Sequence, residues 1–320
     1  MSCALLGLGI VAPAAQDCGA LAGALAGPGS GSFVVSTIPD DADARVRRLP
    51  RLERMALAAA REALRPAAPT ESLGLVFGTG YGGLGATVDF LEGIATRGPE
   101  FGSPTAFHQS VHHSPAGQLS IALGLRGPSL TVSARELSGE MALAVGQNLL
   151  TTGRAEAVLV VAADERVPAL EAAYRAFGAS LKAGEGAAAV LLGRDGGPLR
   201  VEQPILTAHA VPVLRFPSPE QFAPLIHESL RSSFGQMSFS LAAPNAEIEE
   251  AEIAALEDCP PLSKRWADTR HFGFHPSAGL LRFVAAALRV SLEPTGAACA
   301  VHGLSLGGGQ SVTIVRHASS

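Results

Sequence analysis

Two glycine-rich motifs have the residue spacing of known functional turns, one that binds dinucleotides and one that carries a nucleophilic serine. The run from Gly78 to Gly83 (GTGYGG) fits the G-x-G-x-x-G pattern of dinucleotide-binding turns, and the run from Gly303 to Gly307 (GLSLG) fits the G-x-S-x-G turn that exposes a nucleophilic serine. A dinucleotide site needs an acidic residue about 20 positions further on, whereas Asp89 comes too early and lies in a helical pattern. A serine turn of this kind needs a helix after it, whereas residues 308–316 have the pattern of a strand. We interpret both motifs as glycine-rich turns.

The nine histidines include two closely spaced groups, His108, His112 and His113 in one polar segment and His271 and His275 in another. The second pair is four residues apart, a spacing that presents two metal ligands on one helix face, but Gly273 and Pro276 oppose a helix there. We interpret these histidines as surface or hydrogen-bonded residues. The four cysteines match no metal-ligand or redox spacing, so we expect reduced thiols, no metal and no cofactor.

Short β-rich apolar runs alternate with Ala/Leu-rich helical stretches, a pattern that indicates an α/β fold with buried, largely parallel strands. Strands are expected at Cys3–Val11, Ser72–Phe77, Leu130–Ser133, Ala157–Ala162, Ala187–Leu192, Met237–Leu241, Ala298–Val301 and Ser311–Val315. Helices are expected at Leu52–Leu64, Ser138–Leu150, Glu220–Ser233, Glu247–Leu256 and Ala278–Val290. The first of these has an amphipathic pattern typical of a surface helix, and the second is apolar on nearly every face and therefore buried.

Length and charge limit the functional classes. The chain has 320 residues, 47% of them hydrophobic, and a net charge of −5 without a basic run, so nucleic acid and anionic membranes are not expected partners. No apolar stretch reaches the about 18 residues of a membrane span, and the first 15 residues favour a buried strand over a signal peptide. We expect a cytoplasmic protein with a possible boundary at Gly193–Pro198, which divides it into residues 1–195 and 196–320.

Several segments, in order along the chain, resemble the β-ketoacyl synthases of fatty-acid and polyketide synthesis. They are the opening Leu6–Pro13, the glycine turn Gly78–Leu84, Pro115–Gly117, and Leu123–Pro128 leading into Leu130–Ser133. The resemblance implies a thiolase-like α/β fold with two related βαβαβ halves, buried mixed sheets and a central layer of buried helices.

The resemblance also assigns the positions of an active site. Where the family reads roughly Ser-Thr-Ala-Cys-Ala-Ser-Gly, residues 133–139 read SARELSG, which puts Glu136 at the position of the nucleophilic cysteine. His275 matches one catalytic histidine, while Ala243 or a neighbour stands where the other should be. Arg270 replaces a lysine that pairs with the glutamate equivalent to Glu185, which implies an ion pair between these two residues. The final loop of the family matches Leu304–Gln310, with Leu306 at the gating phenylalanine and Gly307 and Gly308 following it.

Condensation in this family needs a cysteine thiolate and two imidazoles, of which this chain keeps one imidazole. The resemblance therefore implies a non-condensing subunit of the chain-length-factor type. Such a subunit pairs with an active ketosynthase, through Leu130–Ser133, and shapes the acyl-chain tunnel in type II polyketide, polyene or fatty-acid-like biosynthesis; an acyl carrier protein is reached through the complex. Glu136, before a helix N-terminus, is hypothesised to hold the register of that interface by hydrogen bonds to backbone amides.

Two alternatives stay open at this point. One is a divergent enzyme, a decarboxylase or an acyl transferase or hydrolase, that uses Glu136 and His275. The other is a decayed homologue in which Glu136 is merely solvated and the fold serves another binding task. The chain is also short around Arg175–Ala183, Ala208–Pro219 and Leu292–Val301, where the family builds the mouth and cover of the active site.

Overall fold

A computed structural model describes residues 2–29, 31–39, 44–67, 72–176, 181–212, 214–231 and 236–318. Its strands form one eleven-stranded sheet in the order β3-β2-β4-β5-β1-β6-β11-β10-β8-β9, with β7 beside β11. The bounds are β1 Ser2–Val11, β2 Gly74–Gly78, β3 Ser129–Val132, β4 Ala157–Asp164, β5 Gly186–Gly193, β6 Leu199–Glu202, β7 Ile205–Ala208, β8 Met237–Ser240, β9 Arg265–Trp266, β10 Ala298–Leu304 and β11 Gly309–His317.

The sheet is mixed. Strand β2 runs parallel to β3 and β4, and β8 runs parallel to β9 and β10. In the middle of the sheet, the neighbours in the order β4-β5-β1-β6-β11-β10 all pair antiparallel. All eight strands expected from the sequence are present, and the fold class is confirmed. The expectation of largely parallel strands is wrong, because among the described strands only the pairs made by β2 and β8 are parallel. The predicted boundary at Gly193–Pro198 is the connection from β5 to β6. Because β6 pairs with both β1 and β11, hydrogen bonding continues across this point.

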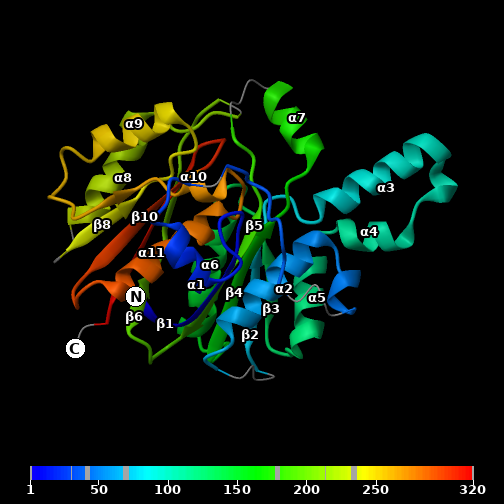
Figure 1. Ribbon diagram of the computed structural model, residues 1–320, viewed down its shortest axis with the longest axis horizontal. Helices are drawn as coiled ribbons and strands as arrows, with labels where there is room; N and C mark the ends of the chain where they lie inside the picture. Colours follow the sequence, from blue (N-terminus) through cyan, green and yellow to red (C-terminus); the bar gives the residue numbers. More distant parts are fainter. Residues whose placement is uncertain are drawn as a thin grey trace.

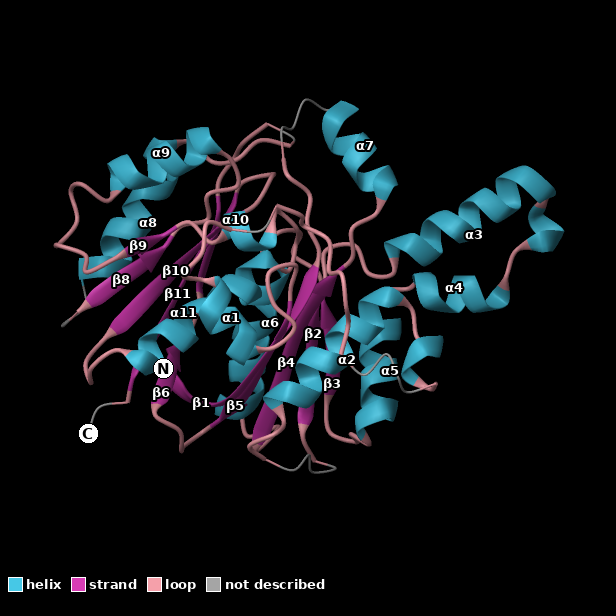
Figure 2. Ribbon diagram, in the orientation of Figure 1, coloured by secondary structure: helices cyan, strands magenta, loops and turns pink. Residues whose placement is uncertain are grey.

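Helices cover the strands in layers (Figures 1 and 2). Helices α6 and α11 lie in the middle, between β2, β4 and β5 on one side and β10 and β11 on the other. The α-helices are α1 Cys18–Ala24, α2 Arg51–Ala63, α3 Leu84–Arg97, α4 Pro104–Ser110, α5 Ser114–Leu123, α6 Ser138–Thr151, α7 Pro168–Ala176, α8 Pro219–Arg231, α9 Ala246–Ala255, α10 Thr269–Phe272 and α11 Ala278–Leu292. The expected burial of α6 is confirmed, since its core side includes Ala142, Leu143 and Leu150.

Helix α2 is more deeply buried than its amphipathic pattern indicates. It packs on β1, β4 and β5, and even Glu53 is fully buried, so the prediction of a surface helix is wrong. The reason lies in β1, where Gly7 and Gly9 have no side chain and therefore let the helix backbone approach; a Cβ at either position would overlap the carbonyl of Ala63 or Ala59.

Helices α3 and α4 form a hairpin that extends away from the sheet (Figure 1). Neither helix has a buried residue, and the hairpin makes its main contacts within itself and with α5. The ring of Phe107 lies 5.5 Å from that of Phe90 and is 57% exposed. The hairpin thus keeps an apolar surface that this chain does not cover.

Candidate functional site

Residues 133–137 form a tight turn between β3 and α6. Arg135 has φ 53°, in the left-handed region, and the hydroxyl of Ser138 donates to its carbonyl oxygen at 2.6 Å while accepting from the amide of Ala134 at 3.1 Å. Left-handed backbone is costly for a side chain larger than glycine, so these bonds fix an otherwise unfavourable turn. The turn directs Glu136 into the protein, where only 3% of the residue is exposed.

The Glu136 carboxylate is hydrogen-bonded within its own chain. Its Oε2 accepts from the hydroxyl of Ser305 at 2.6 Å and from the amide of Leu306 at 3.1 Å. Its Oε1 accepts from the hydroxyl of Tyr174 at 3.4 Å, and the guanidinium of Arg135 lies 3.9 Å away. The alternative of a solvated Glu136 is therefore wrong. The carboxylate does bind a backbone amide, as hypothesised, but that amide belongs to the turn between β10 and β11.

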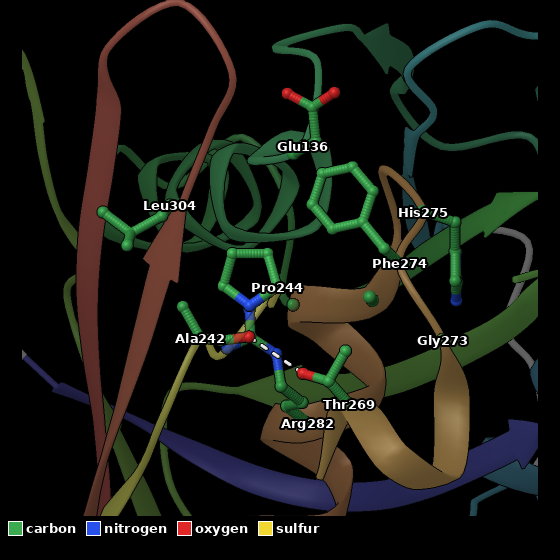
Figure 3. A pocket seen from close by; sticks show the side chains of 11 residues that line it. Glu136, Ala242, Pro244, Thr269, Gly273, Phe274, His275, Arg282 and Leu304 are labelled. Atoms are coloured by element: carbon green, nitrogen blue, oxygen red, sulfur yellow. Dashed lines mark hydrogen bonds between the residues drawn. The ribbon is translucent and has the colours of Figure 1, made fainter. Parts of the chain in front are cut away.

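His275 lines the same cavity as Glu136, together with Ala242, Pro244, Phe274 and residues of α11 (Figure 3). In Figure 3 the Glu136 carboxylate points away from the other labelled side chains, and no hydrogen bond joins it to His275. Among the described residues neither ring nitrogen of His275 has a partner, and burial, followed by the charge of Arg282, lowers its pKa to about 3. The imidazole is therefore neutral. The cavity has room for about one water molecule, ≈ 10 Å³.

The segment predicted to correspond to the second histidine is held by a buried hydrogen-bond network. The carboxylate of Glu252 accepts from the amides of Ala242 and Ala243 at 2.8 and 2.7 Å, and its Oε1 lies 2.5 Å from Nδ1 of His302. Ala243 has a left-handed φ of 38° and lines a surface groove but not the cavity, whereas Ala242 lines the cavity and Pro244 lines both. A side chain at Ala243 would therefore point out of the cavity rather than toward Glu136.

A buried charge pair lies behind the cavity. The guanidinium of Arg282 donates to the carbonyls of Leu241 and His302 at 2.9 and 2.5 Å and lies 4.0 Å from Glu140. Burial raises the pKa of Glu140, and its carboxylate fits between Gly279 and Gly303, where a Cβ would overlap it. Sequence reasoning missed Glu140, Glu252 and Arg282 because each lies inside a helix and belongs to no motif.

The Gly78–Gly83 turn binds a carboxylate of this chain. Asp164 accepts from the hydroxyl of Thr79 at 2.8 Å, the amides of Gly80 and Tyr81 at 3.0 and 3.2 Å, and the hydroxyl of Ser277. Burial raises the pKa of Asp164 to about 7, against the lowering effect of these hydrogen bonds. The amides that a phosphate would use are thus occupied, and the interpretation as a structural turn is confirmed. Gly303–Gly307 likewise runs from the end of β10 into the turn before β11, as expected, with Ser305 buried.

The predicted ion pair between Glu185 and Arg270 does not form. Glu185, directly before β5, pairs instead with Arg51 from the start of α2 and accepts from the amides of Val35 and Arg166. Arg270 is exposed and lines the same surface groove as Ala243, and Gly29 lies close to its backbone and the base of its side chain.

The three residues of the matched final loop lie together at the β10–β11 turn. Leu306 is buried in an apolar cluster with Tyr174 and Phe274, and its amide binds Glu136. Gly307 and Gly308 have φ values of 100° and 97°, and the amide of Gly307 donates to the carbonyl of Arg215 at 2.8 Å.

Neither metal ligation nor a membrane span is found in the described part of the chain. No group of three or more His, Cys, Asp or Glu residues there is arranged to hold a metal ion. His108, His112 and His113 are exposed, and His271 and His275 do not share a helix because α10 ends at Phe272. None of the described helices is long and apolar enough to cross a bilayer.

Comparison with known proteins identifies the family. The family model described as "Beta-ketoacyl synthase, N-terminal domain" matches residues 42–216, just over half of the chain. The ishigamide ketosynthase/chain length factor structure has a TM-score of 0.83 at 21% identity, and the match covers 100% of both chains. AntDE:AntF, a type II polyketide synthase acyl carrier protein in complex with its ketosynthase bound to the hexaketide, has a TM-score of 0.79 at 15% identity and covers 98% of this chain and 99% of that one. No curated protein matches the sequence. The chain belongs to the β-ketoacyl synthase family.

Proposed function

We propose that this chain is a non-condensing ketosynthase-like subunit of the chain-length-factor type, which pairs with an active ketosynthase and shapes its acyl-chain tunnel. The observation that carries the proposal is Glu136. By its sequence neighbours it is expected at the position of the nucleophile, and its carboxylate is hydrogen-bonded to Ser305, Leu306 and Tyr174. A carboxylate held in this way is a poor nucleophile, and the family's chemistry needs a thiolate.

The rest of the cavity supports the same proposal. His275 is neutral and unpartnered among the described residues, and the space beside it holds no more than about one water molecule. An acyl chain or a malonyl group has no room there. The likeness to the ishigamide ketosynthase/chain length factor and to a carrier protein–ketosynthase complex supports a ketosynthase and an acyl carrier protein as the partners.

An uncovered surface supports the pairing. Strand β3 is the last strand of the sheet and pairs only with β2 among the described residues, so its other edge has free backbone groups. Leu130 of β3 is 42% exposed and Ile121 of α5 is 78% exposed, next to the α3–α4 hairpin with Phe107. An apolar sheet edge of this kind fits a partner that continues the sheet and covers the hairpin.

Co-expression with a ketosynthase from an adjacent gene tests the pairing. We expect a stable 1:1 complex by size-exclusion chromatography coupled to light scattering. Leu130→Lys should weaken the complex at least tenfold because it places a charge at the centre of the interface. Leu292→Lys is the matched control, since Leu292 is 80% exposed at the far end of α11, away from β3. A well-behaved monomer that binds no ketosynthase would contradict the proposal.

Mass spectrometry of carrier-bound substrates tests the missing chemistry. Incubation of the isolated chain with malonyl- and acyl-carrier protein should leave both carriers and the protein mass unchanged, and turnover should appear only when the ketosynthase is added. Acylation of this chain, or loss of carbon dioxide in its presence alone, would favour a divergent enzyme instead.

A further inference from the structure

The turn between β10 and β11, residues 305–308, is called the tip loop below, and it is attached to three other segments of the chain. Ser305 and Leu306 donate to Glu136 of the β3–α6 turn. Gly307 donates to the carbonyl of Arg215, and the carbonyl of Gly308 accepts from the amide of His209 at 2.9 Å. Within the hairpin the amide of Ser305 donates to the carbonyl of Gly309 at 2.8 Å and the amide of Gly308 donates to the carbonyl of Ser305 at 3.1 Å. The two consecutive glycines, Gly307 and Gly308, have positive φ and add conformational freedom at the end of the loop. The attachments to other segments therefore add to the loop's own bonds in fixing its position.

The tip loop separates two spaces. On its outer side Leu306 forms a wall of a pocket of ≈ 450 Å³ with Leu181, Leu214, Phe216 and Ile248. On its inner side the amide of Leu306 binds Glu136, which lines the small cavity with His275. Leu306 itself is only 2% exposed. A movement of the tip loop would join the outer pocket to the inner cavity.

Glu136 also fixes the cover above the tip loop. Tyr174 is the only buried residue of α7, and its hydroxyl binds both Glu136 and the hydroxyl of Tyr81, the latter at 2.8 Å. Its ring meets Phe274 edge-on at 6.2 Å, in the cluster that contains Leu306. One carboxylate thus connects the β3–α6 turn, the tip loop and α7.

From these contacts we infer that Glu136 is a positioning residue that holds the tip loop and α7 closed, with Leu306 as the wall between the outer pocket and the inner cavity. The role needs hydrogen-bond acceptors and not a negative charge. Oε2 alone accepts from both Ser305 and Leu306, so the single carbonyl oxygen of a glutamine can take its place, and the amide of that glutamine can donate to Tyr174. The inference concerns the isolated chain and does not rest on the pairing proposed above.

Hydrogen exchange of the isolated chain, read by mass spectrometry, tests this role. In Glu136→Ala the amides of residues 305–308 and of α7 should exchange roughly tenfold faster or more, because the tip loop loses two bonds to a carboxylate. Glu136→Gln should exchange at nearly the wild-type rate. If the charge matters instead, the glutamine variant will behave like the alanine variant, and the inference is wrong.

Glu62→Ala is the matched control for loss of a carboxylate that binds two amides. Glu62 accepts from the amides of Ile10 and Cys18 at 2.9 and 2.8 Å, away from the tip loop. This variant should speed exchange around those residues and leave residues 305–308 unchanged. Equal exchange at the tip loop in both alanine variants would mean global destabilisation and would overturn the inference.

Ser305→Ala keeps the test decisive if Glu136→Ala does not fold. It removes one of the two tip-loop bonds and leaves the amide of Leu306 on Glu136. We expect a smaller but measurable acceleration confined to residues 305–308. No change there in a folded Ser305→Ala protein would show that the tip loop does not depend on its bonds to Glu136.

Discussion

Arg51 and Glu185 form an ion pair across 134 positions of the chain, with Nη2 of Arg51 2.5 Å from Oε1 of Glu185 and Nε 3.1 Å from Oε2. Glu185 is only 1% exposed, so removing its partner leaves a buried charge. We expect Arg51→Ala to lower the free energy of unfolding by about 3 kcal/mol, measured by urea denaturation. Arg270→Ala is the control, because Arg270 is exposed, and should change it by less than about 0.5 kcal/mol. Equal losses in both variants would contradict the pairing.

Glu53 should make stability depend on pH. It is fully buried, neither of its oxygens has a hydrogen-bond partner among the described residues, and burial raises its pKa from 4.5 to about 7. Since the folded protein holds this proton more tightly than the unfolded chain, its contribution is favourable below pH 4.5 and is lost as the pH rises through 7.

Glu53→Gln should therefore gain stability relative to the wild type between pH 5 and pH 8, by about 2–3 kcal/mol. Unfolding free energies of both proteins across that range give the measurement. Asp164, whose pKa burial also raises to about 7, is present in both and cancels in the difference. Parallel pH curves would contradict the expectation.

At position 135 glycine should give a more stable protein than alanine, the reverse of the usual effect of these two residues on stability. Its φ of 53° disfavours any side chain, so Arg135→Gly should be more stable than Arg135→Ala by about 1 kcal/mol, although glycine normally destabilises. Thermal or chemical denaturation of the two variants decides this. The alanine variant being equal or better would mean that the turn is not strained.

Restoring the family's side chains should not restore its chemistry. In a Glu136→Cys/Ala243→His double variant the imidazole starts from a residue that faces the surface groove and whose amide is bound to Glu252. The cavity has room for only about one water molecule, so it is too small for the imidazole ring. We expect no loss of carbon dioxide from malonyl-carrier protein by mass spectrometry; clear turnover by the double variant alone would contradict this geometry.

The sequence predicted the strands and the central helices because their apolar patterns are long and regular. Residues 199–208 escaped prediction, since β6 and β7 are four residues each and lie at a turn-rich connection. The predicted replacement of the cysteine by Glu136 rests on its neighbours in the chain and stays a prediction. Its partner Ser305 was not, because the two are 169 positions apart and meet only when the β10–β11 turn folds over α6.

The wrong partner for Glu185 has a similar cause. Arg51 lies in a helix whose pattern indicated only an outward polar face, so nothing in the sequence singled it out from the other arginines. Glu252 and His302 were missed because they lie in different elements, α9 and β10, and form their buried hydrogen bond without any recognisable sequence motif. The division into residues 1–195 and 196–320 stays a prediction.

Glu140 restricts which residues can replace the two glycines that face it. A Cβ at Gly279 or Gly303 would overlap the Glu140 carboxylate, so alanine is excluded at either glycine while that carboxylate remains. Positions 140 and 279 are therefore epistatic, and alanine at 279 becomes admissible only in a chain that already has a shorter residue at 140. Alanine at 303 would also overlap the hydroxyl of Ser311, so it needs a change there as well. That first step leaves the buried charge of Arg282 without its nearest carboxylate. Sequence drift at these three positions is blocked in either order.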